Sequence, residues 1–347
     1  MALRNTLIFD ENLTIAIVYN AESKVVRGIS QDILALQSTS DTANILYNTL
    51  KNLGYHTEII KVYGSLNSLK KGLEKFSPQQ TLVFNLCDGF KGEITAQASI
   101  TRLISDLSFP QTGSTEEVIL NCTNKSKAKE ILLQAGLHTP DYQVFDKADV
   151  PLEIQMPVIV KPLFEDGSIG INSNSVSDSI DDIRQQIQYV IDNYAQPALV
   201  EEFIPGREIS VSLWGNEKVN VLPMVEHDFS HVANPFAHVL TYETKWIPDY
   251  YYDQNIIWRC PAQIPDSIKN TIAIAAKKAF QVIGLRDFAR IDFRFYEGIP
   301  YIIDINEIPD LHPEAGFAQS ALTAGYSFEG MTQNILDLAL KRECVVC

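Results

Sequence analysis

In the first third of the 347-residue chain, short β-rich segments alternate with helical segments, and no other feature restricts the possible folds as strongly. Parallel strands need crossover connections of a dozen or more residues, which helices supply. The alternation therefore predicts an α/β domain built on a doubly wound parallel sheet. Strands are expected at 14–19, 57–62 and 81–86, and helices at about 39–53, 66–76 and 94–107.

The remainder of the chain mixes strands and helices in a different order, without repeats or low-complexity tracts. Apolar residues at helical spacing mark one face of a helix over about 268–283, namely Ile268, Ile272, Ala275, Ala279 and Val282. Helices are also expected at 125–134, 179–194 and 328–341, and strands at 157–162, 198–203, 208–214, 218–225, 288–296 and 300–305.

The last two of these strands carry the most suggestive polar residues. Alternate side chains share a face of a strand, so Arg290 points the same way as Asp292, and Asp304 the same way as Asn306. The Glu297-Gly298 pair predicts a hairpin that brings the two sets together. Carboxylate and amide oxygens suit Mg²⁺ bound with substrate phosphates. A salt-bridged solvent face is the plainer alternative, but the intervening Ile291, Phe293, Ile303 and Ile305 require a core beneath.

A second segment indicates a phosphate site. Lys161 ends an apolar strand, and a loop with two glycines and a serine, 163–171, follows it. Free backbone N–H groups beside a lysine can cradle a phosphate, although Gly-Ser turns are also common in loops of no such function. Neither GxxxxGK[ST] nor GxGxxG is present. The segment 201–208 is either a simple strand end or a site that presents backbone amides to an adenine edge.

Composition excludes several classes of protein. The chain has 28 basic and 43 acidic residues, a formal charge of −15, which is a poor match for nucleic acid. No apolar run reaches the length of a membrane span, and the first residues do not resemble a secretory signal. Five widely spread cysteines, with one CxxC at Cys344–Cys347, are typical of reduced thiols in a cytoplasmic protein.

Taken together, these segments resemble the ATP-grasp superfamily, and within it the D-alanine–D-alanine ligase family. The matching stretches are collinear across about residues 13–341 and read VFNLCDGFKGE, PQTGS, NKSKAKEILLQAGLHTP, PVIVKP, GSIG, LVEEFIPGREISV, ARIDFRFYEGIPYIIDINEIPDLHP and AGYSFEGMTQNILDLAL. The resemblance implies an N-terminal α/β substrate domain (1–118), a central ATP-grasp small lobe (119–204) and a C-terminal lobe (205–347). It also implies a homodimer, whereas the charge, cysteines and hydropathy described above predict a cytoplasmic protein that contacts neither membrane nor nucleic acid.

The same resemblance assigns roles to residues around ATP. Arg290 would stabilise a developing oxyanion, and Lys245 would contact phosphate. Asp292, Asp304 and Asn306 would bind Mg²⁺, with two ions expected and Mn²⁺ as a substitute, although the family usually has Glu at the position of Asp304. The residues expected to bind the nucleotide are Lys125, Lys161, Ser168, Gly170, Glu201, Glu202, Phe203, Ile204 and Glu208.

The substrate side departs from the family pattern. The N-terminal Glu that binds the first D-alanine has no clear equivalent, because the spacing around Glu22 is broken. Asp310 and Ala315 stand where the family has the Gly and Ser that bind the second D-alanine's carboxylate. Asp88 replaces a His, and Gly167 replaces a Ser of the flexible loop. The substrate-side candidates are Asp88, Glu93, Asp310 and Glu314.

These departures lead to an ADP-forming carbon–nitrogen ligase that acts on something other than two D-alanines. The most specific candidate is the ligase of mycosporine-like amino acid biosynthesis, in which an amino acid and mycosporine-glycine would give an imine. One alternative is a D-alanine–D-alanine ligase of peptidoglycan synthesis with a divergent pocket. Another is a non-catalytic ATP-binding protein, which the retention of Arg290, Asp292, Asp304 and Asn306 disfavours.

Overall fold

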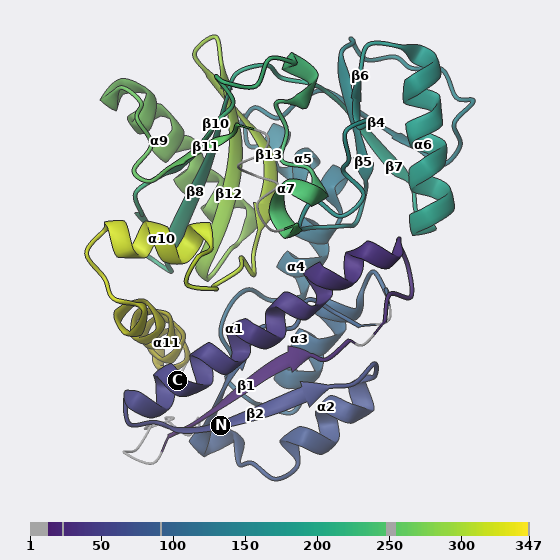
Figure 1. The fold of residues 1–347 in the computed structure, drawn as a ribbon. Helices are drawn as coiled ribbons and strands as arrows, with labels where there is room; N and C mark the ends of the chain where they lie inside the picture. Colours follow the sequence, from purple (N-terminus) through teal and green to yellow (C-terminus); the bar gives the residue numbers. More distant parts are fainter. Residues whose placement is uncertain (1–12, 23, 91, 248–254, 346–347) are drawn as a thin grey trace.

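A computed structural model describes residues 13–22, 24–90, 92–247 and 255–345 (Figure 1). Three β-sheets organise these residues, and the predicted α/β class with an N-terminal parallel sheet is confirmed. Cys347, and with it the terminal CxxC, lies outside the described residues, while Cys87, Cys122 and Cys260 are free thiols. No helix in the described ranges is both long and apolar enough to cross a bilayer.

The N-terminal sheet has the order β2-β1-β3, and both pairings are parallel. Its strands are β1 (Thr14–Asn20), β2 (His56–Val62) and β3 (Thr81–Asn85), and its helices are α1 (Ile33–Asn52), α2 (Leu66–Leu73) and α3 (Ala96–Asp106). Strand β1 is buried along almost its whole length because helices cover both faces. Helix α1 begins six residues earlier than predicted, which shortens the loop after β1.

The central sheet is antiparallel, with the order β4-β7-β5-β6. Its strands are β4 (Tyr142–Phe145), β5 (Val158–Pro162), β6 (Val176–Ser177) and β7 (Ala198–Glu202). Helix α6 (Ile180–Tyr194) packs Ile183, Ile187 and Val190 against one face, and the other face is turned toward the rest of the molecule (Figure 1). The sequence pattern did not predict the short strands β4 and β6.

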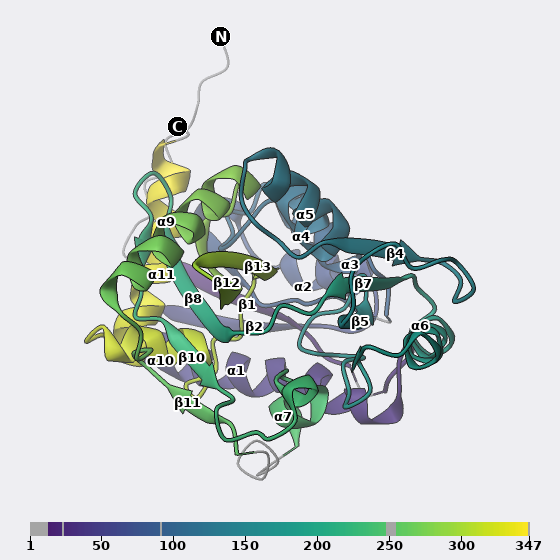
Figure 2. The same ribbon diagram turned by 90° about the horizontal axis from the view of Figure 1, so that it is seen from above.

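The largest sheet follows the order β11-β10-β8-β12-β13, with β9 on the edge of β8. Its strands are β8 (Arg207–Gly215), β9 (Asn220–Val221), β10 (Val225–Asp228), β11 (Ile257–Arg259), β12 (Asp287–Tyr296) and β13 (Ile299–Asn306). Helices α4 (Glu116–Thr123), α5 (Lys125–Gln134) and α9 (Asp266–Ile283) share its core, and Figure 2 shows them on one side of the sheet. Helix α7 (Tyr242–Trp246) lies between this sheet and the central one, and α10 (Gly316–Thr323) and α11 (Phe328–Val345) complete the chain.

Two predictions about this lobe were wrong in detail. The single strand expected over 218–225 is divided into β9 and β10, because Pro223 has no N–H to donate to a neighbouring strand. Val282 was expected on the buried face of α9 but is 39% exposed, and Ile283 takes its place in the core.

The hairpin between β12 and β13 forms as predicted. Glu297 and Gly298 both have positive φ, 48° and 84°, which suits a two-residue turn matched to the twist of the strands. Asp292 pairs directly with Asp304, and Arg290 with Asn306. Beyond this point the register shifts, because Phe293 pairs with Ile302 and leaves Ile303 as an extra residue. The bulge overturns the expectation that Ile303 faces the core: Ile302 does so instead, and Ile303 lines a cleft.

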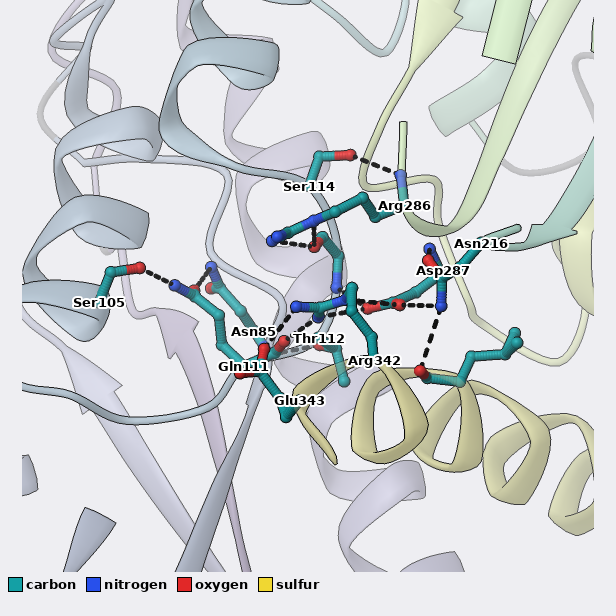
Figure 3. A network of polar contacts seen from close by, with 12 residues as sticks. Asn85, Ser105, Gln111, Thr112, Ser114, Asn216, Arg286, Asp287, Arg342 and Glu343 are labelled. Atoms are coloured by element: carbon teal, nitrogen blue, oxygen red, sulfur yellow. Dashed lines mark hydrogen bonds and ion pairs between the residues drawn. The ribbon is translucent and has the colours of Figure 1, made fainter. Parts of the chain in front are cut away.

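A buried polar network joins the N-terminal sheet to the large sheet (Figure 3). The Asp287 carboxylate is fully buried at the start of β12 and accepts hydrogen bonds from Gly113 N (2.8 Å) and Asn216 Nδ2 (3.1 Å). Arg342 on α11 donates to the same carboxylate at 2.9 and 3.1 Å, and also to the carbonyl of Gln111 at 2.7 Å. Because its partners come from three separate segments, this ion pair fixes how the N-terminal sheet sits beneath the cleft.

We expect Asp287→Asn to lower the free energy of unfolding by about 2–4 kcal/mol, because it removes the fully buried carboxylate that pairs with Arg342 and leaves only the pair of Arg342 with Glu343. Differential scanning calorimetry would show this as a fall in Tm of several degrees. Asp106→Asn is the matched control, since Asp106 is 65% exposed and its ion pair with Arg102 should contribute less than about 1 kcal/mol. Equal Tm values for the two variants would contradict the importance given to the Asp287–Arg342 pair.

Candidate active site

A cleft of about 570 Å³ lies where the three sheets meet, and residues from all three sheets line it. The loop after β3 and the first turns of α1 form one wall. The inner face of the central sheet with the loop 163–171 forms a second, and strands β8, β10, β12 and β13 form the third. Convergent charged side chains in a single large cleft are the usual mark of a ligand site.

The hairpin of β12 and β13 presents the four polar residues that the sequence singled out. The Arg290 guanidinium donates to both oxygens of Asp292, with Nε–Oδ1 at 2.9 Å and Nη2–Oδ2 at 3.0 Å. Asn306 Nδ2 donates to Asp292 Oδ2 at 3.2 Å. Directly opposed residues of an antiparallel pair share a face, so Asp304 joins this cluster. The structure therefore brings all four residues together, as the sequence pattern predicted.

Lys125 reaches this cluster from the first turn of α5, where Asn124 caps the helix by accepting from Lys127 N. Its Nζ lies 2.8 Å from Asp166 Oδ1 and 3.0 Å from Asp304 Oδ1. Burial alone would raise the pKa of Asp304, but Lys125 and Lys161 outweigh it and hold that pKa well below its usual range. Asp304 is therefore ionised at neutral pH.

A second buried cluster surrounds Glu201 on β7. Its two carboxylate oxygens lie 2.9 Å from Lys129 Nζ and 3.0 Å from Lys161 Nζ. Burial lowers the pKa of Lys129 to about 8, although the Glu201 carboxylate opposes this shift. Lys161 Nζ also donates to the Ile303 carbonyl at 3.2 Å, where the bulge turns that backbone toward the cleft. The lysine at the end of β5 is thus tied to the metal-binding hairpin expected from the sequence.

The far end of the cleft combines aromatic and ionic groups. Glu208 on β8 lies 2.7 Å from Arg294 Nη2, and the Arg294 guanidinium stacks 5.4 Å from the ring centres of Phe203 and Phe229. Phe203 and Ile204 follow β7 and line the cleft. His227 lies beside Glu208 across the sheet, and burial lowers its pKa to about 3, so it is neutral at physiological pH. A slot lined by aromatic and apolar side chains suits a flat heterocycle.

The loop 163–171 is held down over the cleft by helix α7 and the residues before it. Ser168 Oγ donates to the Leu240 carbonyl, and Trp246 Nε1 donates to the Gly167 carbonyl, both at 2.8 Å. Lys245, on α7, also lines the cleft. Desolvation by the cleft walls lowers the pKa of Lys245, and the positive charge of Arg290 lowers it further. Gly170 belongs to this loop but does not itself line the cleft.

The remaining end of the cleft is acidic. Asp88, Glu93 and Asp310 line it, whereas Glu314 is exposed and does not. Asp88 is open to the cleft, but enclosure by the cleft walls raises its pKa to about 7. A hydrogen bond from Thr39 lowers this pKa, whereas the Asp310 and Asp166 carboxylates raise it further. Asp310 Oδ1 accepts from His312 N at 2.8 Å and from Thr42 Oγ1 at 3.4 Å.

Several residues in or beside the cleft were missed from sequence, and simple patterns could have found two of them. Lys129 is one helical turn after Lys125, and Arg294 is two residues after Asp292 on the same face of β12. Glu307 follows the hairpin, is 3% exposed and accepts from Gln97 Nε2 at 3.0 Å. Burial raises the pKa of Glu307 to about 8. Neither Glu307 nor its partner Gln97 belongs to a sequence pattern that would have indicated its role.

Comparison with known proteins identifies relatives along most of the chain. Residues 131–337 match the family model described as D-ala D-ala ligase C-terminus. The uncharacterized protein y4sG of Sinorhizobium fredii is 31% identical over 278 residues, which cover 78% of this chain and 80% of that protein. The D-alanine–D-alanine ligase of Desulforamulus reducens is 27% identical over 312 residues, covering 86% and 92%.

Solved structures share the fold. The crystal structure of D-alanine–D-alanine ligase from Bacillus anthracis complexed with ATP matches with a TM-score of 0.74 at 18% identity, over 96% of this chain and all of that one. The VanG D-Ala:D-Ser ligase from Enterococcus faecalis matches with a TM-score of 0.69 at 17% identity, over 94% of this chain and 99% of that one. The ATP-grasp fold expected from the resemblance is therefore confirmed.

Proposed function

Because this chain belongs to the D-alanine–D-alanine ligase family, we propose that it is an ADP-forming ligase that uses ATP to join an amino acid's amine to an activated oxygen-bearing carbon. The observation that carries the proposal is the convergence of Lys125, Lys161 and Arg290 with two carboxylates in one cleft. Such a set neutralises a polyphosphate and a developing oxyanion.

The proposed reaction has two steps. An oxygen of the first substrate attacks the γ-phosphorus of ATP, and ADP leaves. The amine of the second substrate then attacks the carbon that bears this oxygen, and phosphate departs with the oxygen. Lys125, Lys161 and Lys245 would hold the phosphates, and Arg290 would stabilise the negative charge that develops as the amine attacks. Phe203, Ile204 and Glu208 would bind the nucleoside.

The hairpin residues fit Mg²⁺. In the described part of the chain no three His, Cys, Asp or Glu side chains are grouped to hold a metal by themselves. Mg²⁺, however, is commonly held by one or two carboxylates together with substrate phosphates. Asp292 and Asp304, directly opposed on the hairpin, with the amide oxygen of Asn306, supply such a set. When bound, Mg²⁺ would neutralise charge on the transferred phosphoryl group.

The substrates that we propose are an amino acid and a small molecule other than D-alanine, with mycosporine-glycine as the specific candidate and an imine as product. The acidic end of the cleft supports this, since Asp88 and Asp310 line the end where a second D-alanine carboxylate would have to bind. Carboxylates accept hydrogen bonds from hydroxyl groups readily but repel another carboxylate. We further propose that the molecule acts in the cytoplasm as a homodimer, with domains 1–118, 119–204 and 205–347.

The second candidate is a D-alanine–D-alanine ligase of peptidoglycan synthesis. The observation in its favour is that relatives bearing this name, from Desulforamulus reducens and Haemophilus influenzae among others, align over 86% and 88% of the chain. The two candidates share the phosphoryl-transfer step and differ only at the acidic end.

We expect Arg290→Lys to lose about a hundredfold or more in kcat, or ~3 kcal/mol, because a single ammonium cannot reproduce the planar fork of a guanidinium. Steady-state ADP release would measure this loss, and calorimetry would check that the Tm is unchanged. Arg102→Lys is the control, since Arg102 is 64% exposed on α3. A fall smaller than threefold would show that Arg290 serves only as the structural partner of Asp292.

We expect D-alanine alone to be a poor substrate. Loss of two hydrogen bonds to a carboxylate weakens binding by ~1.5–3 kcal/mol each, before repulsion from Asp310 is counted. The test compares ADP release with D-alanine alone and with an amino-acid mixture plus mycosporine-glycine. The double variant Asp310→Gly/Ala315→Ser should improve turnover of D-alanine. Robust formation of the D-alanine dipeptide by the unaltered enzyme would favour the second candidate.

The raised pKa of Asp88 predicts a pH dependence. Asp88 is neutral below pH 7 and ionised above it, so a carboxylate-bearing ligand at the acidic end should bind more weakly as the pH rises from 6 to 8. One added charge at close range corresponds to about 1 kcal/mol, or about fivefold in Kd. Calorimetric titration of D-alanine into the enzyme with a non-hydrolysable ATP analogue would measure it, and Asp88→Asn should flatten the profile. Parallel profiles for the two proteins would refute the assignment.

A further inference from the structure

Residues 24–32, between β1 and α1, form a loop that we call the clasp loop, and it touches both ATP-grasp walls of the cleft. Gly28 N donates to the Asn193 carbonyl, at the end of α6, at 3.0 Å. The Gln31 carbonyl accepts from Tyr242 Oη, on α7, at 2.5 Å. Lys24, Val26 and Arg27 of the same loop line the cleft on its substrate side. The clasp loop therefore contacts the elements on both sides of the site.

The strongest contact of the clasp loop is an ion pair with the loop 163–171, which we call the phosphate loop. Arg27 Nη2 lies 2.5 Å from Glu165 Oε1, and both side chains are largely buried, with 15% and 16% of their surface exposed. Gln196 Nε2 donates to the same Glu165 oxygen at 2.7 Å. Gln196 Oε1 in turn accepts from Phe164 N at 2.7 Å. Charge-assisted hydrogen bonds of this length in a shielded place are among the stronger polar contacts.

The packing around the ion pair leaves little room for adjustment. Gly28 has φ of +109°, and a Cβ there would lie 2.3 Å from Asp32 Oδ2 and 3.1 Å from Tyr194 Cε1. At the opposite edge of the same ring, a Cβ at Gly170 would lie 3.1 Å from Tyr194 Cε2. The buried Tyr194 ring is thus held between one glycine of the clasp loop and one of the phosphate loop.

The Arg27–Glu165 ion pair is connected to Lys125, the lysine proposed to bind phosphate, through the neighbouring residue Asp166. Glu165 precedes Asp166, whose Oδ1 accepts from Lys125 Nζ at 2.8 Å, and Lys125 also contacts Asp304. A displacement of Glu165 would therefore move the group that holds Lys125. The chain of contacts runs from the substrate side of the cleft to the β12–β13 hairpin through two sets of ion pairs, joined by the peptide bond between Glu165 and Asp166.

We propose that Arg27 is a positioning residue that couples phosphoryl transfer to ligation. Its ion pair with Glu165 holds the clasp loop against the phosphate loop. Lys125 is then aligned, and water is excluded, only when the substrate side of the cleft is closed. The inference rests on the proposed ligase function. Excluding water protects a reactive phosphate ester from hydrolysis, and small misplacements of binding groups reduce rates strongly. Without the ion pair, ATP should be hydrolysed without product.

The first experiment measures the ratio of ADP released to ligated product, with D-alanine and with an amino-acid mixture plus mycosporine-glycine in parallel. Arg27→Gln and Glu165→Gln should each raise this ratio by about threefold or more, and the double variant should be no worse than either single one. Arg27→Lys should restore the ratio to within about twofold, because a lysine can still donate one charge-assisted bond. Arg102→Gln, on the exposed surface of α3, is the control.

The second experiment needs no turnover and so separates this inference from the proposed function. Hydrogen exchange of the full-length protein, measured with Mg²⁺ and a non-hydrolysable ATP analogue, should be faster by about tenfold at both 24–32 and 163–171 in Arg27→Gln than in Arg102→Gln. If the unaltered enzyme releases no ADP, the proposed function fails, while the exchange result still decides whether the clasp exists. An unchanged ratio in an active Arg27→Gln enzyme, or exchange that is unaffected at either loop, would overturn the proposal.

Discussion

The antiparallel pairing of β12 with β13 places Asp292 directly opposite Asp304, and the rest of the cleft is arranged around these two charges. Carboxylates withdrawn from water are tolerated only when they are paired. Arg290 pairs with the first and Lys125 with the second, while Lys161 is shared between Glu201 and the backbone of the bulge. The groups that balance one another's charge in the cleft are therefore the groups that would hold a metal–triphosphate in the proposed function. This local balance explains how a chain with a formal charge of −15 can present a site for a polyanion.

The N-terminal sheet contributes to the site through its position rather than through its own chemistry. Asp88 follows β3 at the carboxyl end of the parallel sheet, which is where ligands of such sheets are usually bound. The Asp287–Arg342 pair (Figure 3) and the clasp loop both attach this part of the chain to the other two sheets. The substrate end is consequently shaped by contacts that lie far apart in the sequence.

Much of this arrangement could be predicted because it depends on local periodicity. A period of two places Arg290, Asp292 and Asp304 on one face, and a Glu-Gly pair specifies the turn between the strands. The bulge at Ile303 could not be predicted, since nothing in the alternation of Ile302 and Ile303 shows which of them will face the core.

Long-range partners were equally hidden from the sequence. Arg27 and Glu165 are 138 residues apart, and each alone resembles an ordinary surface charge. Helix α4 was missed because its eight residues are too few for a clear period, although Thr115 caps it. The role of Glu314 as a substrate residue stays a prediction. Its side chain is exposed and lies outside the cleft, so its position does not support that role.

The central claim is that ATP activates an oxygen of the substrate, which then leaves as part of phosphate. The most direct measurement uses substrate labelled with ¹⁸O, in the carboxylate of D-alanine and in the ring carbonyl of mycosporine-glycine, followed by mass spectrometry of the released phosphate. The proposed reaction predicts ADP and inorganic phosphate that carries one labelled oxygen from whichever substrate is consumed. Formation of AMP and pyrophosphate, or of unlabelled phosphate alongside ligated product, would contradict it.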